Sequence, residues 1–235
     1  PTSAWLNVGD EAILSNMVAD LRAVFPHVQI SIVSSNPEGA LSSYLVDMIP
    51  AQNIDQLIKT AQASDLIILG GGGIFYDYWG FNTEELLTPN HTGHGIFVDV
   101  ALLAVLLDKP LMTYAVGVGP LNTQSAKHFT KMIFTQANRI SVRDRESKDT
   151  LIDLGIDEGL IKITADPVFS NQEDFLTSAS KGVVISSEKT RQSPRVSVVL
   201  RNWDNAAVDQ VDLEKSIAQA LDRFLEEYGG SVRFV

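Results

Sequence analysis

The sequence contains no cysteine, which excludes disulfides, thiolate catalysis and thiolate metal sites. Basic residues are also few, because 18 Lys and Arg stand against 29 Asp and Glu and give a net charge of -11. Binding a phosphate backbone or an anionic membrane requires a basic face, so this balance argues against nucleic acid as a partner. An anionic substrate would need a local basic cluster.

Long apolar runs and targeting signals are absent as well. No stretch approaches the roughly 18 uncharged residues of a membrane span. The first five residues have neither the basic nor the apolar region of a signal peptide, and a soluble cytoplasmic protein is the simplest expectation. Of the four histidines, His91 and His94 lie three apart in a Gly- and Thr-rich loop without ligand spacing, so we expect surface histidines and no metal site.

Strand and helix signals alternate along the chain, which predicts an α/β fold with a doubly wound parallel sheet. Apolar residues recur at three- and four-residue spacing in the predicted helices, and the predicted strands are short apolar runs. The predicted helices are Asp10–Phe25, Gln52–Ala63, Ile96–Leu107, Gln124–Ala137, Glu146–Leu154 and Val211–Tyr228. The predicted strands are Val28–Val33, Asp65–Leu69, Pro110–Val116, Arg139–Val142, Ile161–Thr164, Val196–Leu200 and Ser231–Val235.

The composition changes after the predicted strand Ile161–Thr164. Residues 177–195 are rich in Ser, Lys and Thr without a sustained helical period, which is typical of a linker. One strand, one helix and one strand follow, and these cannot close a core of their own. We therefore expect an α/β domain over residues 1–176 and the start of a second, incomplete α/β domain over residues 196–235.

Several motifs follow predicted strands directly. Gly70–Gly73 and Gly117–Pro120 are glycine-rich, and ligands of a parallel sheet bind beyond the carboxyl ends of the strands. Gly71, Gly72, Gly117 and Gly119 are therefore candidate binding residues. Alternatively, a neighbouring loop lies against the glycine block and Gly117–Pro120 is an ordinary turn. The glycine block lacks both the GxGxxG spacing of a dinucleotide site and the Lys-Ser/Thr end of a P-loop.

An arginine and a carboxylate also follow predicted strands, at the same edge of the sheet as the glycines. Arg143 follows the strand Arg139–Val142, where it could clamp a carboxylate or phosphate or form an ion pair with Asp144, Glu146 or Asp166. Asp166 could accept a hydrogen bond from a substrate hydroxyl, pair with Arg143 or cap backbone N–H groups. A third candidate site is the turn into the first helix, where Asn7, Gly9 and Asp10 could hold an anion or form an ordinary cap.

Six blocks together resemble, in the same order, the polysaccharide pyruvyl transferases. The resemblance runs from Asn7 to about Trp203. The blocks are Asn7–Leu14, Gly70–Ile74, Gly117–Pro120, Ser141–Ser147 with Leu151 and Leu154-Gly155, Ala165–Pro167, and Leu200-Arg201. Any one block is a weak signal, but their joint occurrence in this order is specific.

The resemblance implies a GT-B-like two-domain enzyme that moves the enolpyruvyl unit of phosphoenolpyruvate onto two hydroxyls of a cell-surface polysaccharide sugar. It implies no metal or organic cofactor, a sugar or lipid-linked glycan acceptor, and membrane association only through such an acceptor. Arg143 would contact phosphoenolpyruvate, and Arg201 would face the cleft between the two domains. The family's general-acid histidine has no counterpart before Val235. Asp166, Asp10 and His94 are candidate bases. A GT-B nucleotide-sugar glycosyltransferase and a non-catalytic carbohydrate-binding protein are the alternatives.

Overall fold

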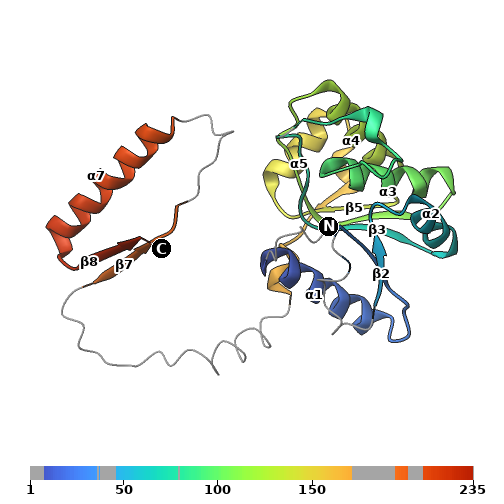
Figure 1. Cartoon of the computed structure of the whole chain (residues 1–235), viewed down its shortest axis with the longest axis horizontal. Coiled ribbons are helices and arrows are strands. Elements are labelled where there is room, and N and C mark those ends of the chain that lie inside the picture. The colour runs from blue at the N-terminus through green and yellow to red at the C-terminus, as the bar shows by residue number, and fades with distance from the viewer. Residues whose placement is uncertain are drawn as a thin grey trace. The chain divides into compact units, whose positions relative to one another are not determined.

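A computed structural model describes residues 8–35, 37, 46–78, 80–170, 194–200 and 209–234. The chain divides into two compact units, residues 1–176 and 177–235. The first unit contains a parallel sheet with helices, as predicted, and Figure 1 shows its elements. The candidate residues Asn7 and Arg201, the predicted strand end at Val235 and most of the predicted linker lie outside the described residues.

The first unit alternates strands and helices along its length. Its strands are β1 (Ser31–Ser34), β2 (Asp47–Pro50), β3 (Ile67–Phe75), β4 (Leu111–Val118), β5 (Arg139–Val142) and β6 (Ile161–Ile163). Its helices are α1 (Val8–Val24), α2 (Ile54–Ala63), α3 (His94–Leu106), α4 (Gln124–Gln136) and α5 (Arg145–Asp153). The short 3-10 helices are η2 (Thr83–Glu85), η3 (Glu158–Leu160) and η4 (Pro167–Phe169).

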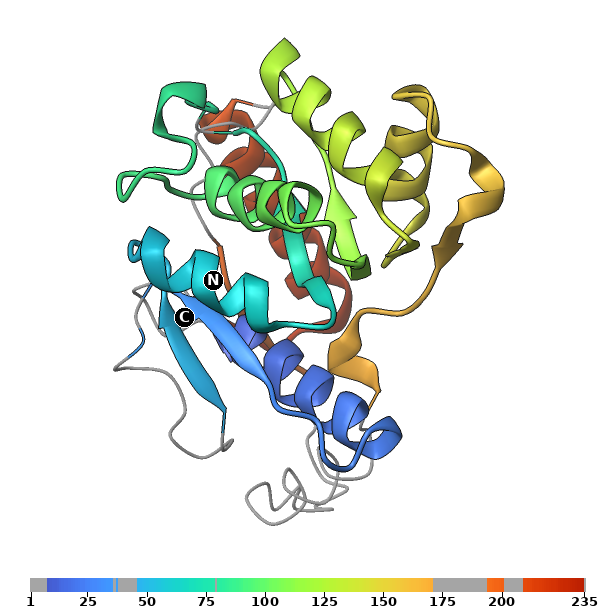
Figure 2. The same ribbon diagram turned by 90° about the vertical axis from the view of Figure 1, so that its right-hand side faces the viewer.

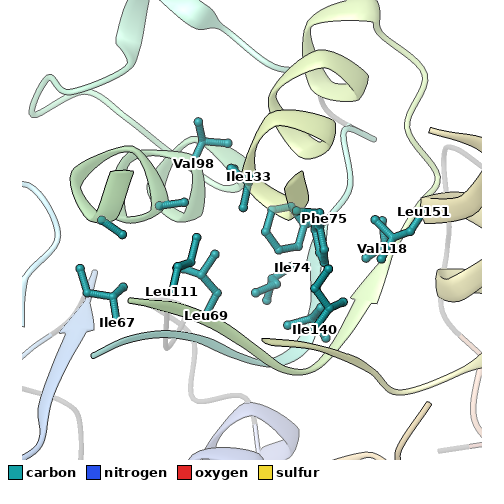
Figure 3. Packing of buried hydrophobic residues seen from close by; sticks show 14 of the residues in the cluster. Ile67, Leu69, Ile74, Phe75, Val98, Leu111, Val118, Ile133, Ile140 and Leu151 are labelled. Atoms are coloured by element: carbon teal, nitrogen blue, oxygen red, sulfur yellow. The ribbon is translucent and has the colours of Figure 1, made fainter. Parts of the chain in front are cut away.

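The four strands β3, β4, β5 and β6 form one parallel sheet in that order, and β1 pairs with β2 in a separate parallel pair. Successive strands are neighbours, so right-handed crossovers place α3 and α4 on the same face. Figures 1 and 3 show both helices on that face and α1 on the other. Parallel strands therefore bring their carboxyl ends to one edge of this sheet.

The core lies between the sheet and the α3–α4 layer (Figure 3). Phe75 and Phe134 are fully buried and meet edge to face with ring centroids 4.9 Å apart. Helix α3 is apolar nearly all round, and eight of its residues are buried, as its sequence predicts. Such a helix is stable beneath other elements, because any face left in water would expose apolar surface.

The glycine block Gly70–Gly73 and the residue Gly117 lie inside strands, which corrects the predicted strand ends at Leu69 and Val116, whereas Gly119 and Pro120 follow β4. Strand β3 continues to Phe75 and β4 to Val118, and Gly73 pairs with Gly117 across the two strands. Between the pairs Gly70–Tyr114 and Gly72–Val116, Gly71 and Ala115 both have positive φ, of 80° and 50°. Glycine tolerates the left-handed backbone at Gly71, so the block Gly70–Gly73 marks an irregular strand and not a turn.

The start of the chain also differs from its prediction. Helix α1 begins at Val8, so Gly9 belongs to its first turn and not to a preceding loop. Further along this helix, Asn16 Nδ2 donates to the Pro167 carbonyl at 2.8 Å. The turn η4 consequently lies beside α1 (Figure 2).

The second unit contains β7 (Arg195–Val198), α7 (Gln210–Tyr228) and β8 (Ser231–Phe234). The two strands are parallel, and α7 connects them. No residue of α7 is buried, and Val211 is 54% exposed. In the described segments of both units, no helix has the length and apolarity that crossing a membrane requires.

Candidate functional site

Arg143 lies across the ends of β3 and β4. Its backbone N–H donates to the Val116 carbonyl at 3.1 Å, which fixes the residue directly after β5. A Cβ on Gly117 would lie 2.9 Å from Arg143 Nε, and one on Gly73 would lie 3.3 Å from Arg143 Nη2. The two glycines therefore leave a bare stretch of backbone on which the guanidinium rests, with 35% of the side chain exposed.

Two carboxylates accompany this guanidinium. Arg143 Nη1 lies 3.2 Å from Asp166 Oδ2, and Arg143 Nε lies 3.4 Å from Asp144 Oδ2. Two of the three ion pairs considered for Arg143 are thus present, and no pair with Glu146 is found among the described residues. Burial would raise the pKa of Asp144, but hydrogen bonds from Ser147 and the charge of Arg143 hold it below its ordinary value.

The first turn of α1 contributes acidic residues next to the glycine strand. Asp10 Oδ1 would lie 3.9 Å from a Cβ on Gly72. Burial and, to a smaller extent, the charge of Asp10 raise the pKa of Glu11 and of Tyr76, which follows β3. The start of α1 and the end of β3 therefore meet at the edge of the sheet where Arg143 lies.

The other predicted glycines have neighbours that explain them by packing. Cβ atoms on Gly70 and Gly71 would collide with Met17 and Ile13 of α1. Gly119 has φ of 101°, and a Cβ there would lie 3.3 Å from Thr150 Oγ1 of α5. The structure thus brings Gly117 and Asp166 to Arg143 and places Asp10 beside Gly72, whereas Gly71 lies under α1 and Gly119 lies against α5.

The loop after β3 is fixed by buried polar contacts. Asp77 accepts hydrogen bonds from the backbone N–H groups of Asn122 and Thr123, both at 2.6 Å, ahead of α4. Burial would raise its pKa, but these hydrogen bonds and the nearby His94 lower it. Asp77 thereby ties the ends of β3 and β4 together.

Both loop histidines are buried, which contradicts the prediction of surface residues. His91 Nδ1 lies 2.5 Å from Asp99 Oδ2, and its Nε2 lies 2.7 Å from the Ala51 carbonyl. His94 is 4% exposed, and its Nδ1 lies 3.0 Å from the Tyr76 carbonyl. Because a carbonyl only accepts, this nitrogen carries the proton, and Nε2 has no partner among the described residues. His94 thus joins α3 to the residue after β3.

Acidification should destabilise the protein through His94. Burial lowers its pKa below about 6.5, and the hydrogen bond to Tyr76 and the charge of Asp77 do not reverse this. The unfolded chain therefore binds more protons below pH 6.5, so stability is lost as the pH falls through the folded-state pKa, by at most about 1.4 kcal/mol per pH unit. Melting temperatures measured from pH 7.5 to 5 should fall less steeply in His94→Asn, whose amide can still donate to Tyr76. Equal slopes would contradict this assignment.

Two solved structures are similar to this chain in fold. UDP-N-acetylglucosamine 2-epimerase from Rickettsia bellii is 13% identical with a TM-score of 0.51, and the match covers 96% of this chain and 58% of that chain. UDP-GlcNAc 2-epimerase from Neisseria meningitidis bound to UDP-GlcNAc is 12% identical with a TM-score of 0.54, covering 96% and 62%. The chain thus spans about three fifths of each structure. This likeness concerns the fold alone and confirms the predicted GT-B-like α/β class.

The comparison of sequences is more specific. No curated protein matches the chain. The family model described as "Polysaccharide pyruvyl transferase" matches residues 7–235, which include every candidate site residue. The chain belongs to the polysaccharide pyruvyl transferase family.

Proposed function

We propose that the protein transfers the enolpyruvyl unit of phosphoenolpyruvate onto a sugar of a cell-surface polysaccharide and forms a pyruvate ketal. Membership of the family supports pyruvyl transfer. The observation that carries the proposal for this chain is Arg143, whose guanidinium rests on the Gly73–Gly117 backbone at the carboxyl edge of the sheet. Ligands of open parallel sheets bind at this edge.

Arg143 has the chemistry to bind the donor. Phosphoenolpyruvate carries a carboxylate and a phosphate, and a planar guanidinium binds either through two parallel N–H···O bonds. Gly117 and Gly73 admit the guanidinium, and the positive end of α1, with Gly9 and Asp10 in its first turn, lies at the same edge. The proposal also keeps Asn7, Gly72 and Arg201 as donor or acceptor contacts, whereas Gly71 and Gly119 pack against α1 and α5.

The reaction requires one proton to be added and two to be removed. One sugar hydroxyl adds to C2 of the enol while the methylene carbon takes up a proton, and the second hydroxyl then displaces phosphate from C2. We assign Asp166 as the group that accepts a hydroxyl proton because its carboxylate lies 3.2 Å from the proposed donor clamp. Asp10 and His94 are the other candidates for this role.

The test incubates the full-length protein with phosphoenolpyruvate and a panel of lipid-linked or nitrophenyl sugars and measures phosphate release. Acceptor-dependent release, with a ketal in the product, is the expected result. Consumption of a nucleotide sugar without a response to phosphoenolpyruvate would favour a glycosyltransferase instead, and glycan binding without turnover would favour a binding protein. We also propose a cytoplasmic location, with membrane association only through a lipid-linked acceptor.

A further inference from the structure

The edge of Arg143 that would bind the donor is already in contact with a carboxylate of the chain itself. Asp166 Oδ2 lies 3.2 Å from Arg143 Nη1, whereas Nη2 has neither a hydrogen bond nor an ion pair within the described segments. We propose that the Asp166 carboxylate occupies the anion site of Arg143 in the free protein. An incoming anion displaces this carboxylate from Arg143. The identity of that anion as phosphoenolpyruvate rests on the proposed function.

The contact between Asp166 and Arg143 is of a kind that an anion can displace. It uses one carboxylate oxygen and one guanidinium nitrogen, and its side chains are 21% and 35% exposed. Partly exposed single-point ion pairs contribute little to stability. A free carboxylate or phosphate offers two oxygens to Nη1 and Nη2 together, and such two-point pairing is stronger. The ligand therefore has a geometric advantage over Asp166.

Both side chains have other contacts that survive the displacement. Asp166 Oδ1 accepts a hydrogen bond from the Val168 N–H at 3.1 Å, and the next residue, Pro167, is held to α1 through Asn16. Arg143 Nε stays beside Asp144, whose other oxygen accepts a hydrogen bond from the Ser147 N–H at 2.7 Å. Only Arg143 Nη1 and Asp166 Oδ2 change partners, so the exchange requires no movement of either backbone.

The exchange also gives the reaction an order. While Asp166 Oδ2 is paired with Arg143, it is engaged and does not meet a sugar hydroxyl. Binding of the anion releases this oxygen, and Oδ1 holds the carboxylate in place at the site. The acceptor hydroxyl is consequently activated only after the donor has bound.

The test is the affinity of the full-length protein for two anions, phosphoenolpyruvate and inorganic phosphate, measured by titration calorimetry. Asp166→Asn removes the competing charge and keeps an oxygen that can accept from Val168. We expect this variant to bind both anions about two- to fivefold more tightly, since a partly exposed ion pair is lost from the free state only. Glu146→Gln, which removes an exposed carboxylate from the first turn of α5, is the matched control and should not change the affinity.

Each outcome of the titrations supports or overturns the role of Asp166 as an internal occupant. Unchanged or weaker binding by a folded Asp166→Asn protein, or no anion binding by either protein, overturns the inference. Equal tightening in Glu146→Gln also overturns it, because the effect would then be a general change of charge. Tightening for phosphate, with no binding of phosphoenolpyruvate by any variant, supports the internal occupant and rejects the proposed donor.

Discussion

Replacing Arg143 with lysine should lower kcat/KM for phosphoenolpyruvate about ten- to hundredfold in the full-length protein. Lysine keeps the charge but loses the planar two-point geometry, so a charge-assisted hydrogen bond of roughly 1.5–3 kcal/mol is largely lost. A tenfold factor corresponds to about 1.4 kcal/mol, which gives the expected range. Folding should survive because the pairs with Asp144 and Asp166 are partly exposed.

The control for this variant is Arg145→Lys, two residues away on the exposed start of α5. Steady-state kinetics and melting temperature are measured on the same preparations, and Arg145→Lys should keep both. An Arg143→Lys protein that melts earlier but keeps full activity would reject the clamp. Arg143 would then be a structural partner of its two carboxylates.

A second variant moves the same guanidinium without changing it. In Gly117→Ala, the new Cβ would lie 2.9 Å from Arg143 Nε and 3.0 Å from the Gly73 Cα, so the side chain must shift. Misplacing a positioned group by about 1 Å can cost up to about a hundredfold in rate, and activity should therefore fall with Arg143 still present. Gly159→Ala is the matched control, because its nearest neighbour, Asp157 Oδ1, lies at an ordinary 3.4 Å.

Much of the framework could be predicted because its apolar residues recur with a helical or strand period. The predicted strand Arg139–Val142 has the bounds of β5, and the predicted helix start at Gln124 is the start of α4. The glycine strands were not predictable in this way, since glycine usually marks a turn. Here Gly73 and Gly117 pair within the sheet, which only the tertiary structure reveals.

The candidate site likewise has features that the sequence predicts and features that only the tertiary structure reveals. A pair between Arg143 and Asp166 could be anticipated because both residues follow strands of one parallel sheet. The burial of His91 was missed because its Gly- and Thr-rich surroundings are typical of a surface loop. A signal was nevertheless present in Asp99, which lies in the middle of an apolar helix. A buried carboxylate needs a partner, and His91 supplies it.

Gly71→Ala should destabilise the protein by about 2–5 kcal/mol. Overpacking a core costs about 1–3 kcal/mol, and a left-handed backbone costs a non-glycine residue about 1–2 kcal/mol more. Both apply, because Gly71 has φ of 80° and its new Cβ would collide with the branched side chain of Ile13. For a protein of this size, the melting temperature should fall by roughly 4–20 °C.

A double-mutant cycle with Ile13→Ala separates packing from ligand binding at Gly71. The smaller side chain makes room for the new methyl group, so the double variant should be more stable than the sum of the two single effects predicts. Gly159→Ala again serves as the control for adding a methyl group. If Gly71→Ala melts like the unaltered protein but loses affinity for phosphoenolpyruvate, Gly71 contacts the substrate. If the protein melts early and the folded fraction binds normally, Gly71 is a glycine because α1 packs directly on its backbone.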